Sequence, residues 1–184
     1  MESPGNEIVI DQTKKWIESV VIGCNFCPFA AKPFNAGNIL YTVSNAKTHA
    51  EALRQVMLEL YKLDENENTE TSLLIFAEGF SSLDEYLDLV DLAESLLADQ
   101  EYEGIYQVAS FHPNYLFAGT NDDDPGNYTN RSIFPMLHFL REESIETALE
   151  KFPDPDQIPE RNIAFTKQKG LAFMENLRRS CMMD

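Results

Sequence analysis

Residues 110–142 concentrate the side chains of this sequence that are able to do chemistry. The stretch holds two of the three histidines, His112 and His138, and it holds Arg131 and Arg141 in a chain with only 14 lysines and arginines. Imidazole groups move protons near neutral pH, and guanidinium groups bind carboxylates and phosphates. Polar groups on a long connection between packed elements are more often functional than decorative. We therefore expect the functional site in this stretch.

Arg131 has the sequence surroundings of an anion-binding residue. It lies among short polar residues, and a helix is predicted to begin at Pro135. A helix N-terminus presents free backbone N–H groups, and a guanidinium binds a carboxylate or phosphate through paired hydrogen bonds. The alternative is that Asn130 or Ser132 caps the helix and that Arg131 pairs with the acidic loop before it. The candidate ligand-binding residues are Tyr115, Asn127, Thr129, Asn130, Arg131, Ser132 and Arg141.

His112 is the first candidate catalytic residue. It follows a predicted strand and precedes Pro113, and a residue at the carboxyl end of a strand in an α/β sheet points toward the crevice where ligands bind. There an imidazole can act as general acid or base, or contact a ligand. The alternative is a histidine that is hydrogen-bonded to the loop that it starts.

Cys27 is the second candidate catalytic residue. It lies on a loop next to Pro28, and a thiol held there is a candidate nucleophile whose proton His112 would accept. The alternative is a small buried thiol that packs among phenylalanines. Cys24 gives the pair the spacing of a redox or zinc motif, but the pair follows a predicted helix instead of starting one, and no second pair exists. No metal site is predicted, and the identity of any cofactor stays open.

His138 is the third candidate catalytic residue. It lies three residues before Arg141 on a helix predicted from Pro135 to about Lys151, so the two side chains are expected on one face. His138 would then turn toward the loop and face His112. The alternative for His138 is a core residue whose hydrogen bonds are made within the protein. The alternative for Arg141 is a surface ion pair.

Composition excludes several classes of protein. The chain of 184 residues is long enough for one domain with a sizeable core. Its 14 cationic and 31 acidic residues give a net charge of −17, which repels nucleic acid and anionic membranes. No apolar run approaches the roughly 20 residues that span a bilayer, and no secretory signal is recognised, so a cytoplasmic location is expected. The charge favours solubility, with an acidic protein-docking surface as the alternative.

Alternating helices and strands are predicted to position the candidate residues. Helical spacing predicts helices over 8–22, with Asp11 as N-cap, over 44–63, capped by Ser44 or Asn45, and over 81–99. The strands are predicted over 38–43, 71–77 and 105–111. The run over 71–77 is almost continuously apolar, which is typical of a central strand covered on both faces.

The second half of the chain is predicted to be mainly helical. A short strand over 115–118 is followed by helices over 135–151 and 159–170 and by an amphipathic helix in the tail. The alternation implies a single α/β domain over 1–184, in which a small, mainly parallel or mixed sheet of three or four strands has helices on its flanks. A ferredoxin-like α+β arrangement is the alternative.

Four segments resemble a known family. They are NFCPFA at 25–30, the segment 110–119 that begins SFHP, the segment 127–142 that begins NYTNRS, and the segment 153–162 that begins PDP. Together they resemble the bacterial and plant proteins grouped as domain of unknown function 1415. The resemblance covers about Thr13 to Gly170 and leaves the tail 171–184 outside. Cys24 and Ile133 depart from the family, in which position 133 tends to be proline.

We expect these features to form one pocket at the strand ends. Its lining would be the Cys27 loop, the His112 turn and the predicted helix start at 127–131. The expected function is that of an enzyme acting on a small anionic metabolite, with Arg131 holding the anion. The alternatives are a module that binds the same kind of anion without catalysis, and a scaffold that docks proteins through its acidic face.

Overall fold

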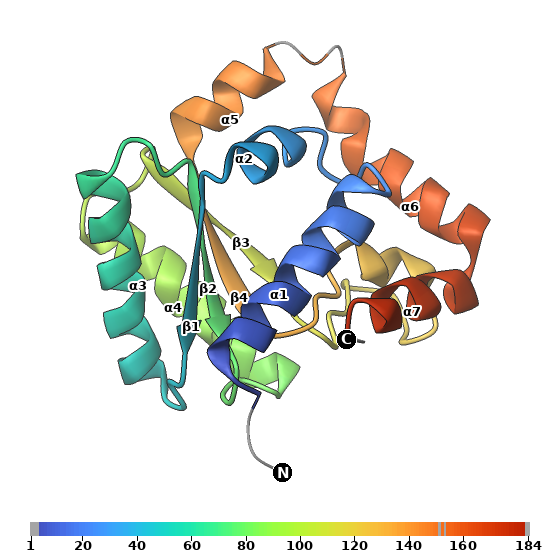
Figure 1. Ribbon diagram of the computed structural model, residues 1–184, viewed down its shortest axis with the longest axis horizontal. Helices are drawn as coiled ribbons and strands as arrows, with labels where there is room; N and C mark the ends of the chain where they lie inside the picture. Colours follow the sequence, from blue (N-terminus) through green and yellow to red (C-terminus); the bar gives the residue numbers. More distant parts are fainter. Residues whose placement is uncertain (1–3, 151, 153, 183–184) are drawn as a thin grey trace.

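The computed structural model describes residues 4–150, 152 and 154–182. Within them, four strands form one open sheet in the order β1-β2-β4-β3, and helices cover both of its faces (Figure 1). β1 and β2 are parallel, and β4 runs antiparallel to both of its neighbours, β2 and β3. The predicted α/β class with a small mixed sheet is confirmed.

The elements follow one another without long gaps. The strands are β1 (Ile39–Ser44), β2 (Thr71–Phe76), β3 (Tyr106–Phe111) and β4 (Met136–Arg141). The α-helices are α1 (Asn6–Trp16), α2 (Ala31–Ala36), α3 (His49–Glu65), α4 (Leu83–Asp99), α5 (Glu142–Leu149), α6 (Ile158–Lys169) and α7 (Leu171–Ser180). A π-helical turn, η1 (Ile17–Ile22), continues α1, and two 3-10 turns are η2 (Pro125–Thr129) and η3 (Pro155–Gln157).

β2 occupies the centre of the sheet, as its apolar run predicted. All six of its residues are buried, because β1 and β4 flank it and helices cover both faces. β1 and β2 are parallel neighbours joined through α3, the kind of crossover that parallel pairing requires. The predicted strands β1 and β3 and the predicted helices α3, α4, α6 and α7 are confirmed, with no end displaced by more than five residues.

β4 is the largest difference from the sequence prediction. A helix was predicted from Pro135, but residues Met136–Arg141 form a strand, and α5 begins only at Glu142. An inner strand that is covered on both faces reads as a continuous apolar run, and its periodicity does not distinguish it from a buried helix. His138 and Arg141, three residues apart on a strand, therefore lie on opposite faces of the sheet. Lys151, the predicted helix end, lies outside the described residues.

Two predicted N-caps are also wrong. Thr48 caps α3, and its hydroxyl and the Glu51 carboxylate form a capping box. Ser44 belongs to β1 instead, and its hydroxyl accepts from the backbone of Ala46. α1 begins directly after Gly5, so Asp11 lies within the helix.

Two loops differ from their predicted form. The predicted strand over 115–118 is an irregular loop, because its backbone groups bond within the loop and not to a neighbouring strand. The segment after Cys24, predicted as extended, turns sharply at Asn25, whose φ is 56°, and contains the short helix α2.

The two faces of the sheet carry separate cores. α3 and α4 cover one face, where Leu74, Phe76, Leu137 and Phe139 lie in a continuous cluster of buried residues. α1 covers part of the other face and buries Trp16 against it, while α6 and α7 lie farther out on the same side (Figure 1). None of the described helices combines the length and the apolar character that crossing a membrane requires.

Candidate functional site

The polar segment after β3 is a folded loop whose side chains are largely bonded to one another. Asn127 is fully buried, and its Oδ1 accepts from the Phe117 backbone N–H at 3.0 Å and from the Thr120 hydroxyl at 2.9 Å. Its Nδ2 donates to the Asn121 carbonyl at 2.8 Å. Asn127 thus holds the loop in shape, which explains a buried amide at this position.

Three neighbours of Asn127 have similar structural contacts. The Thr129 hydroxyl lies 3.0 Å from both the Gly126 carbonyl and Asn130 Oδ1. Asn130 Nδ2 donates to the Ser110 carbonyl, which ties the loop to β3. The Ser132 hydroxyl donates to the Phe134 carbonyl at 2.6 Å. These polar atoms shape the loop, and their predicted role in ligand binding stays a prediction.

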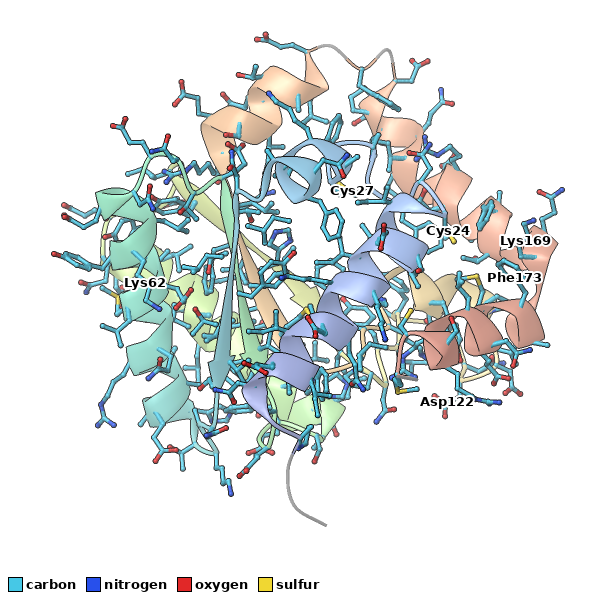
Figure 2. All side chains as sticks on the ribbon, viewed as in Figure 1. Cys24, Cys27, Lys62, Asp122, Lys169 and Phe173 are labelled. Carbon is cyan, nitrogen blue, oxygen red and sulfur yellow. The ribbon has the colours of Figure 1, made fainter. Side chains whose placement is uncertain are left out.

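Arg131 is buried against this loop. No helix begins after it, so the predicted helix N-terminus is wrong. Its Nε donates to the Tyr115 carbonyl at 2.9 Å, and its guanidinium lies 5.0 Å from the centre of the Tyr128 ring. Its Nη atoms contact Asp122, with a 3.3 Å ion pair to Oδ1. The Asp122 side chain is 87% exposed and points out from the loop (Figure 2), so water screens this ion pair strongly.

Arg178 is a second cation at the same place, and the sequence analysis did not single it out. It lies on α7, and its Nε donates to the Ser132 carbonyl at 2.8 Å. Burial lowers the pKa of the Arg178 guanidinium, the nearby Tyr128 phenol opposes this, and the positive charge of Arg131 lowers it further. The two guanidinium groups are therefore close enough to repel each other. Within residues 4–150, 152 and 154–182, no carboxylate forms an ion pair with Arg178.

A sequence signal for Arg178 does exist. It lies four residues after Met174 and three before Cys181, which are both buried, so helical spacing places it on the inner side of α7. Arg179, the next residue, is exposed. The amphipathic spacing of the tail predicted the helix, but it does not reveal which loop the helix packs on.

His112 is completely buried, and both of its ring nitrogens have partners. Nδ1 accepts from the Asn114 backbone N–H at 3.0 Å, so Nε2 carries the proton and donates to the Phe80 carbonyl at 2.9 Å. The ring also packs on Tyr86, with centroids 5.0 Å apart. Burial lowers the pKa of His112 and the charge of Arg178 lowers it further, against the opposing hydrogen bond to Phe80. This is the loop-bonded arrangement given above as the alternative.

Cys27 lies in the loop between η1 and α2, at the upper end of η1 (Figure 2). Burial raises the pKa of its thiol, although the backbone N–H groups of Phe29 and Ala30 oppose this. The thiol is therefore protonated at neutral pH. Because both ring nitrogens of His112 are bonded elsewhere, His112 does not hydrogen-bond Cys27 in this structure. Cys24 and Cys181 are buried free thiols.

His138 lies in the middle of β4 and is half-buried. Its Nε2 is 2.6 Å from the Thr71 hydroxyl oxygen, which is also 2.6 Å from the Phe139 carbonyl oxygen. Its ring centroid is 6.2 Å from that of Phe111. Burial lowers the pKa of His138 to about 4, so the imidazole is neutral.

Arg141 lies apart from the other candidates. Its guanidinium donates to the carbonyls of Leu63 and Thr69 at 2.6 and 3.1 Å, and to the Tyr106 hydroxyl. These bonds fasten the loop between α3 and β2 to the end of the sheet. Among the described residues, no group of three or more His, Cys, Asp or Glu side chains is arranged to hold a metal ion.

The chain is similar to one known family. A family model described as "Protein of unknown function (DUF1415)" matches residues 8–176. The match covers most of the chain, so the protein belongs to this family, and the resemblance found from its four segments is confirmed. The matched range extends beyond the predicted one at both ends and reaches into α7. No curated protein and no solved structure matches the chain.

Proposed function

We propose that this member of the DUF1415 family is a module that binds a small anion between Arg131 and Arg178. One observation carries the proposal. The Arg131 guanidinium lies 5.0 Å from the centre of the Tyr128 ring, and Arg178 is near enough for Tyr128 and Arg131 to affect its pKa. Among the described residues, the exposed Asp122 carboxylate, which pairs with Arg131, is the one acidic partner of the two arginines. Neighbouring like charges repel each other, and a bound anion would offset that repulsion.

The charge of the whole chain makes this pair unusual. With 31 acidic residues for 14 basic ones, the protein has ample carboxylates to pair its arginines. Instead Arg131 and Arg178 are fixed to backbone carbonyls through their Nε atoms, which leaves Nη donors of Arg178 directed at no acceptor in the part of the chain that the structure describes. Guanidinium groups that are positioned in this way are preorganised for an anionic ligand.

The chemistry of the pair indicates the class of ligand. Planar guanidinium groups form parallel hydrogen bonds to the oxygens of carboxylates and phosphates. The net charge of −17 repels large polyanions, which favours a small molecule over nucleic acid. The proposed ligand is therefore a metabolite with a carboxylate or phosphate group.

The observations favour binding over the catalytic alternative. That alternative uses Cys27 as nucleophile and His112 as its base, but the His112 ring is already bonded to Asn114 and Phe80. Burial also raises the pKa of the Cys27 thiol, which reduces the thiolate that a nucleophile requires.

The test is thermal unfolding in the presence of inorganic phosphate and citrate, compared with chloride at equal ionic strength. We expect both anions to raise the Tm of the wild-type protein, with a gain in stability of about 1.4 kcal/mol at tenfold excess over the Kd. Arg178→Gln should abolish the gain. Arg179→Gln, at the exposed neighbouring position, is the matched control and should retain it.

Two results would contradict the proposal. One is a wild-type protein that phosphate and citrate stabilise no more than chloride does. The other is an Arg178→Gln protein that keeps the full gain. Arg131→Gln is a second variant, but its bond to Tyr115 also shapes the loop, so its result counts only where the unliganded variant stays folded.

A further inference from the structure

We propose that the β1 edge of the sheet is an interface between two copies of this chain, whose β1 strands pair antiparallel about a two-fold axis at Tyr41. The strand order β1-β2-β4-β3 makes β1 and β3 the two edges of the sheet. Figure 1 looks onto the β1 edge, with β1 in front of the other strands and α3 and α1 on either side. An edge strand presents backbone groups that no neighbouring strand satisfies, so it pairs readily with a strand of another chain.

Alternate residues of β1 direct their backbone groups away from β2. The carbonyls of Asn38 and Ser44 accept from the N–H groups of the residues just before and just after β2, at 2.8 and 3.2 Å, so the even-numbered residues face β2. Successive residues of a strand direct their N–H and C=O groups to opposite sides, so the outward residues are Ile39, Tyr41 and Val43. No backbone or side-chain group in the described part of the chain bonds to their N–H and C=O groups.

The chain itself partly closes the other edge of the sheet. On β3 the even-numbered residues point outward, and the Tyr106 N–H donates to the Tyr102 carbonyl at 3.1 Å. The Ser110 carbonyl accepts from Asn130 Nδ2 at 3.1 Å. Val108, between them, is the outward residue of β3 for which no described group supplies a bond. The fold therefore leaves β1, and not β3, as its open edge.

The sequence of β1 lacks the features that protect an edge strand from pairing. It reads ILYTVS, with no proline and no charged residue, and its register with β2 is continuous, without a bulge. Soluble monomers protect exposed edges with prolines, charges or bulges. The cations nearest to β1 belong to the flanking helices, where Lys14 lies over the Tyr41 ring and Lys62 is paired with Glu59. A strand of this kind is suited to pairing with another chain.

The charge distribution favours a second copy of this chain as the occupant. Residues 1–62, which include α1, β1 and most of α3, hold six basic and six acidic residues. The whole net charge of −17 therefore falls on residues 63–184. Two copies repel each other through the acidic part of their surface, and they approach with the least repulsion through the β1 side. A two-fold dimer uses the same surface of both copies, so it keeps the two acidic parts apart.

One antiparallel register uses all of the outward groups of β1. Tyr41 opposes Tyr41 of the second copy, and Ile39 opposes Val43 in both directions. Opposed residues at alternate positions of an antiparallel ladder exchange both of their hydrogen bonds, so these pairs satisfy every outward N–H and C=O group. A shift of the register by two residues leaves one outward residue of each strand unpaired. The result is one continuous sheet, with α1 of both copies on one face and α3 of both copies on the other.

An exposed apolar side chain on α3 lies beside the same edge. Leu58 is 50% exposed. It lies four residues before Lys62, whose Nζ is 3.4 Å from the Thr42 hydroxyl oxygen, and three after Gln55, which lines a hollow together with Val43. Helical spacing therefore places Leu58 on the side of α3 that faces the β1 edge. The two-fold arrangement directs it toward α3 of the second copy.

The experiment measures the mass of the full chain by sedimentation equilibrium, and its amide hydrogen exchange, over a series of protein concentrations. The mass should rise from 21.0 kDa toward twice that value. At low concentration the inward amides of β1 should be protected and its outward amides should exchange fast. As the mass rises, the outward amides should become protected too. The Val108 amide, on the β3 edge, is the internal control and should exchange fast throughout.

Proline variants test the ladder itself. Tyr41→Pro removes an outward N–H and leaves the hydrogen bonds to β2 in place, because proline is tolerated where the N–H of an edge strand points to solvent. It should weaken the dimer about thirtyfold or more, as expected for the loss of the two bonds at the axis. Tyr41→Val is the matched control, because it loses the ring but keeps the N–H, and it should weaken the dimer by less than about fivefold. Val43→Pro repeats the test if Tyr41→Pro does not fold.

Four outcomes would overturn the inference. The first is a chain that keeps a mass of 21.0 kDa up to a concentration of about 1 mM. The second is a dimer whose outward β1 amides still exchange fast, which would place the interface on another surface. The third is protection of Val108 together with β1, which would indicate pairing of β1 with the β3 edge of the next copy. The fourth is an equal weakening by Tyr41→Pro and Tyr41→Val, which would assign the contact to the ring and not to the backbone.

Discussion

Helices α3 and α4 bury the central strands β2 and β4 on their face of the sheet, whereas burial along β4 is uneven on the face that α1 covers. On the first face, Leu74, Leu137 and Phe139 are 0% exposed. On the second, His138 and Leu140 of the same strand β4 remain half-buried. Met136 of β4 is 0% exposed on that second face, so the strand is open there only toward its end.

Buried polar groups have hydrogen-bond partners on both faces. On the face that α3 and α4 cover, the closed face, the Glu59 carboxylate is fully buried, and it accepts from Lys62 Nζ at 2.6 Å and from the Ser72 hydroxyl. On the other face, His138 Nε2 bonds to the Thr71 hydroxyl, and no buried side-chain nitrogen or oxygen of the described residues lacks a partner. A buried polar group is stabilised when all of its hydrogen bonds are made.

The largest expected effect comes from truncating β4 on its closed face. Phe139→Ala should lower the free energy of unfolding by about 3–5 kcal/mol, because it leaves a cavity in a close-packed core. Leu140→Ala, one residue along the same strand, should lower it by only about 1 kcal/mol, because Leu140 is already half-buried. Urea unfolding measures both. If both variants lost the same free energy of unfolding, the two faces would not differ in how much they stabilise the protein.

The next effect is the pH dependence that His138 contributes. Its folded pKa of about 4 lies below the unfolded value of about 6.5, so the unfolded chain binds the proton more readily between these values. Stability from this group is complete above pH 6.5 and is lost as the pH falls toward 4, by at most about 3 kcal/mol.

A pair of histidine variants isolates this contribution. Denaturant unfolding from pH 7 to 4 should show a shallower loss of stability for His138→Gln than for the wild type. The pKa of His112 is lowered too, so His112 contributes a loss of stability at falling pH to the wild type and to His138→Gln alike. His49→Gln, in the first turn of α3, is the matched control and should follow the wild type. If the stability of His138→Gln fell with pH as steeply as that of the wild type, another group would be responsible for the pH dependence.

The third effect concerns the buried ion pair on the closed face. Lys62→Met removes the cation from Glu59 and should destabilise the protein by about 2 kcal/mol, because it leaves a buried carboxylate with fewer partners. Adding Glu59→Gln should recover part of this loss. Lys47→Met removes the exposed cation of a surface pair with Glu78 and should change the stability by less than about 1 kcal/mol.

The smallest effect is on the unliganded arginine pair. Arg178→Met relieves repulsion with Arg131 but loses the bond to the Ser132 carbonyl, so the net change without added anion should be within about 1 kcal/mol. Thermal unfolding with and without phosphate measures it. A large destabilisation in the absence of anion would show that Arg178 mainly holds α7 in place.

Local sequence patterns predicted most of the fold. The apolar stripe with Val56 and Leu60 predicted α3, and the continuous run over 71–77 predicted the central position of β2. β4 was missed because it is an inner strand, for which an apolar run carries no period of two, and because Pro135 suits a helix start as well as a strand start. Pairing with β2 and β3 decides that this segment is a strand and not a helix, and that pairing depends on distant parts of the chain.

The sequence predicted which segment holds the candidate site, but it did not predict how the side chains of that segment are arranged. The segment 110–142 does gather polar contacts, and two of the alternatives given for it describe the observed bonds. Arg131 pairs with Asp122 of the acidic loop, and His112 is bonded to the loop that it starts. Arg178 was missed because its partner loop lies 46 residues earlier in the chain. Whether any of these residues acts on a ligand stays a prediction.

The position of β4 between β2 and β3 has a consequence for the order in which the sheet assembles during synthesis. β2 is complete at residue 76, but the strand that covers its second edge is complete only at residue 141, which is 65 residues later. At about 5–20 residues per second, the apolar edge of β2 waits about 3–13 s for its partner, and β3, which is complete at residue 111, waits about 1.5–6 s. Throughout this interval the nascent chain presents an open strand edge, which is the feature that chaperones shield and that promotes aggregation.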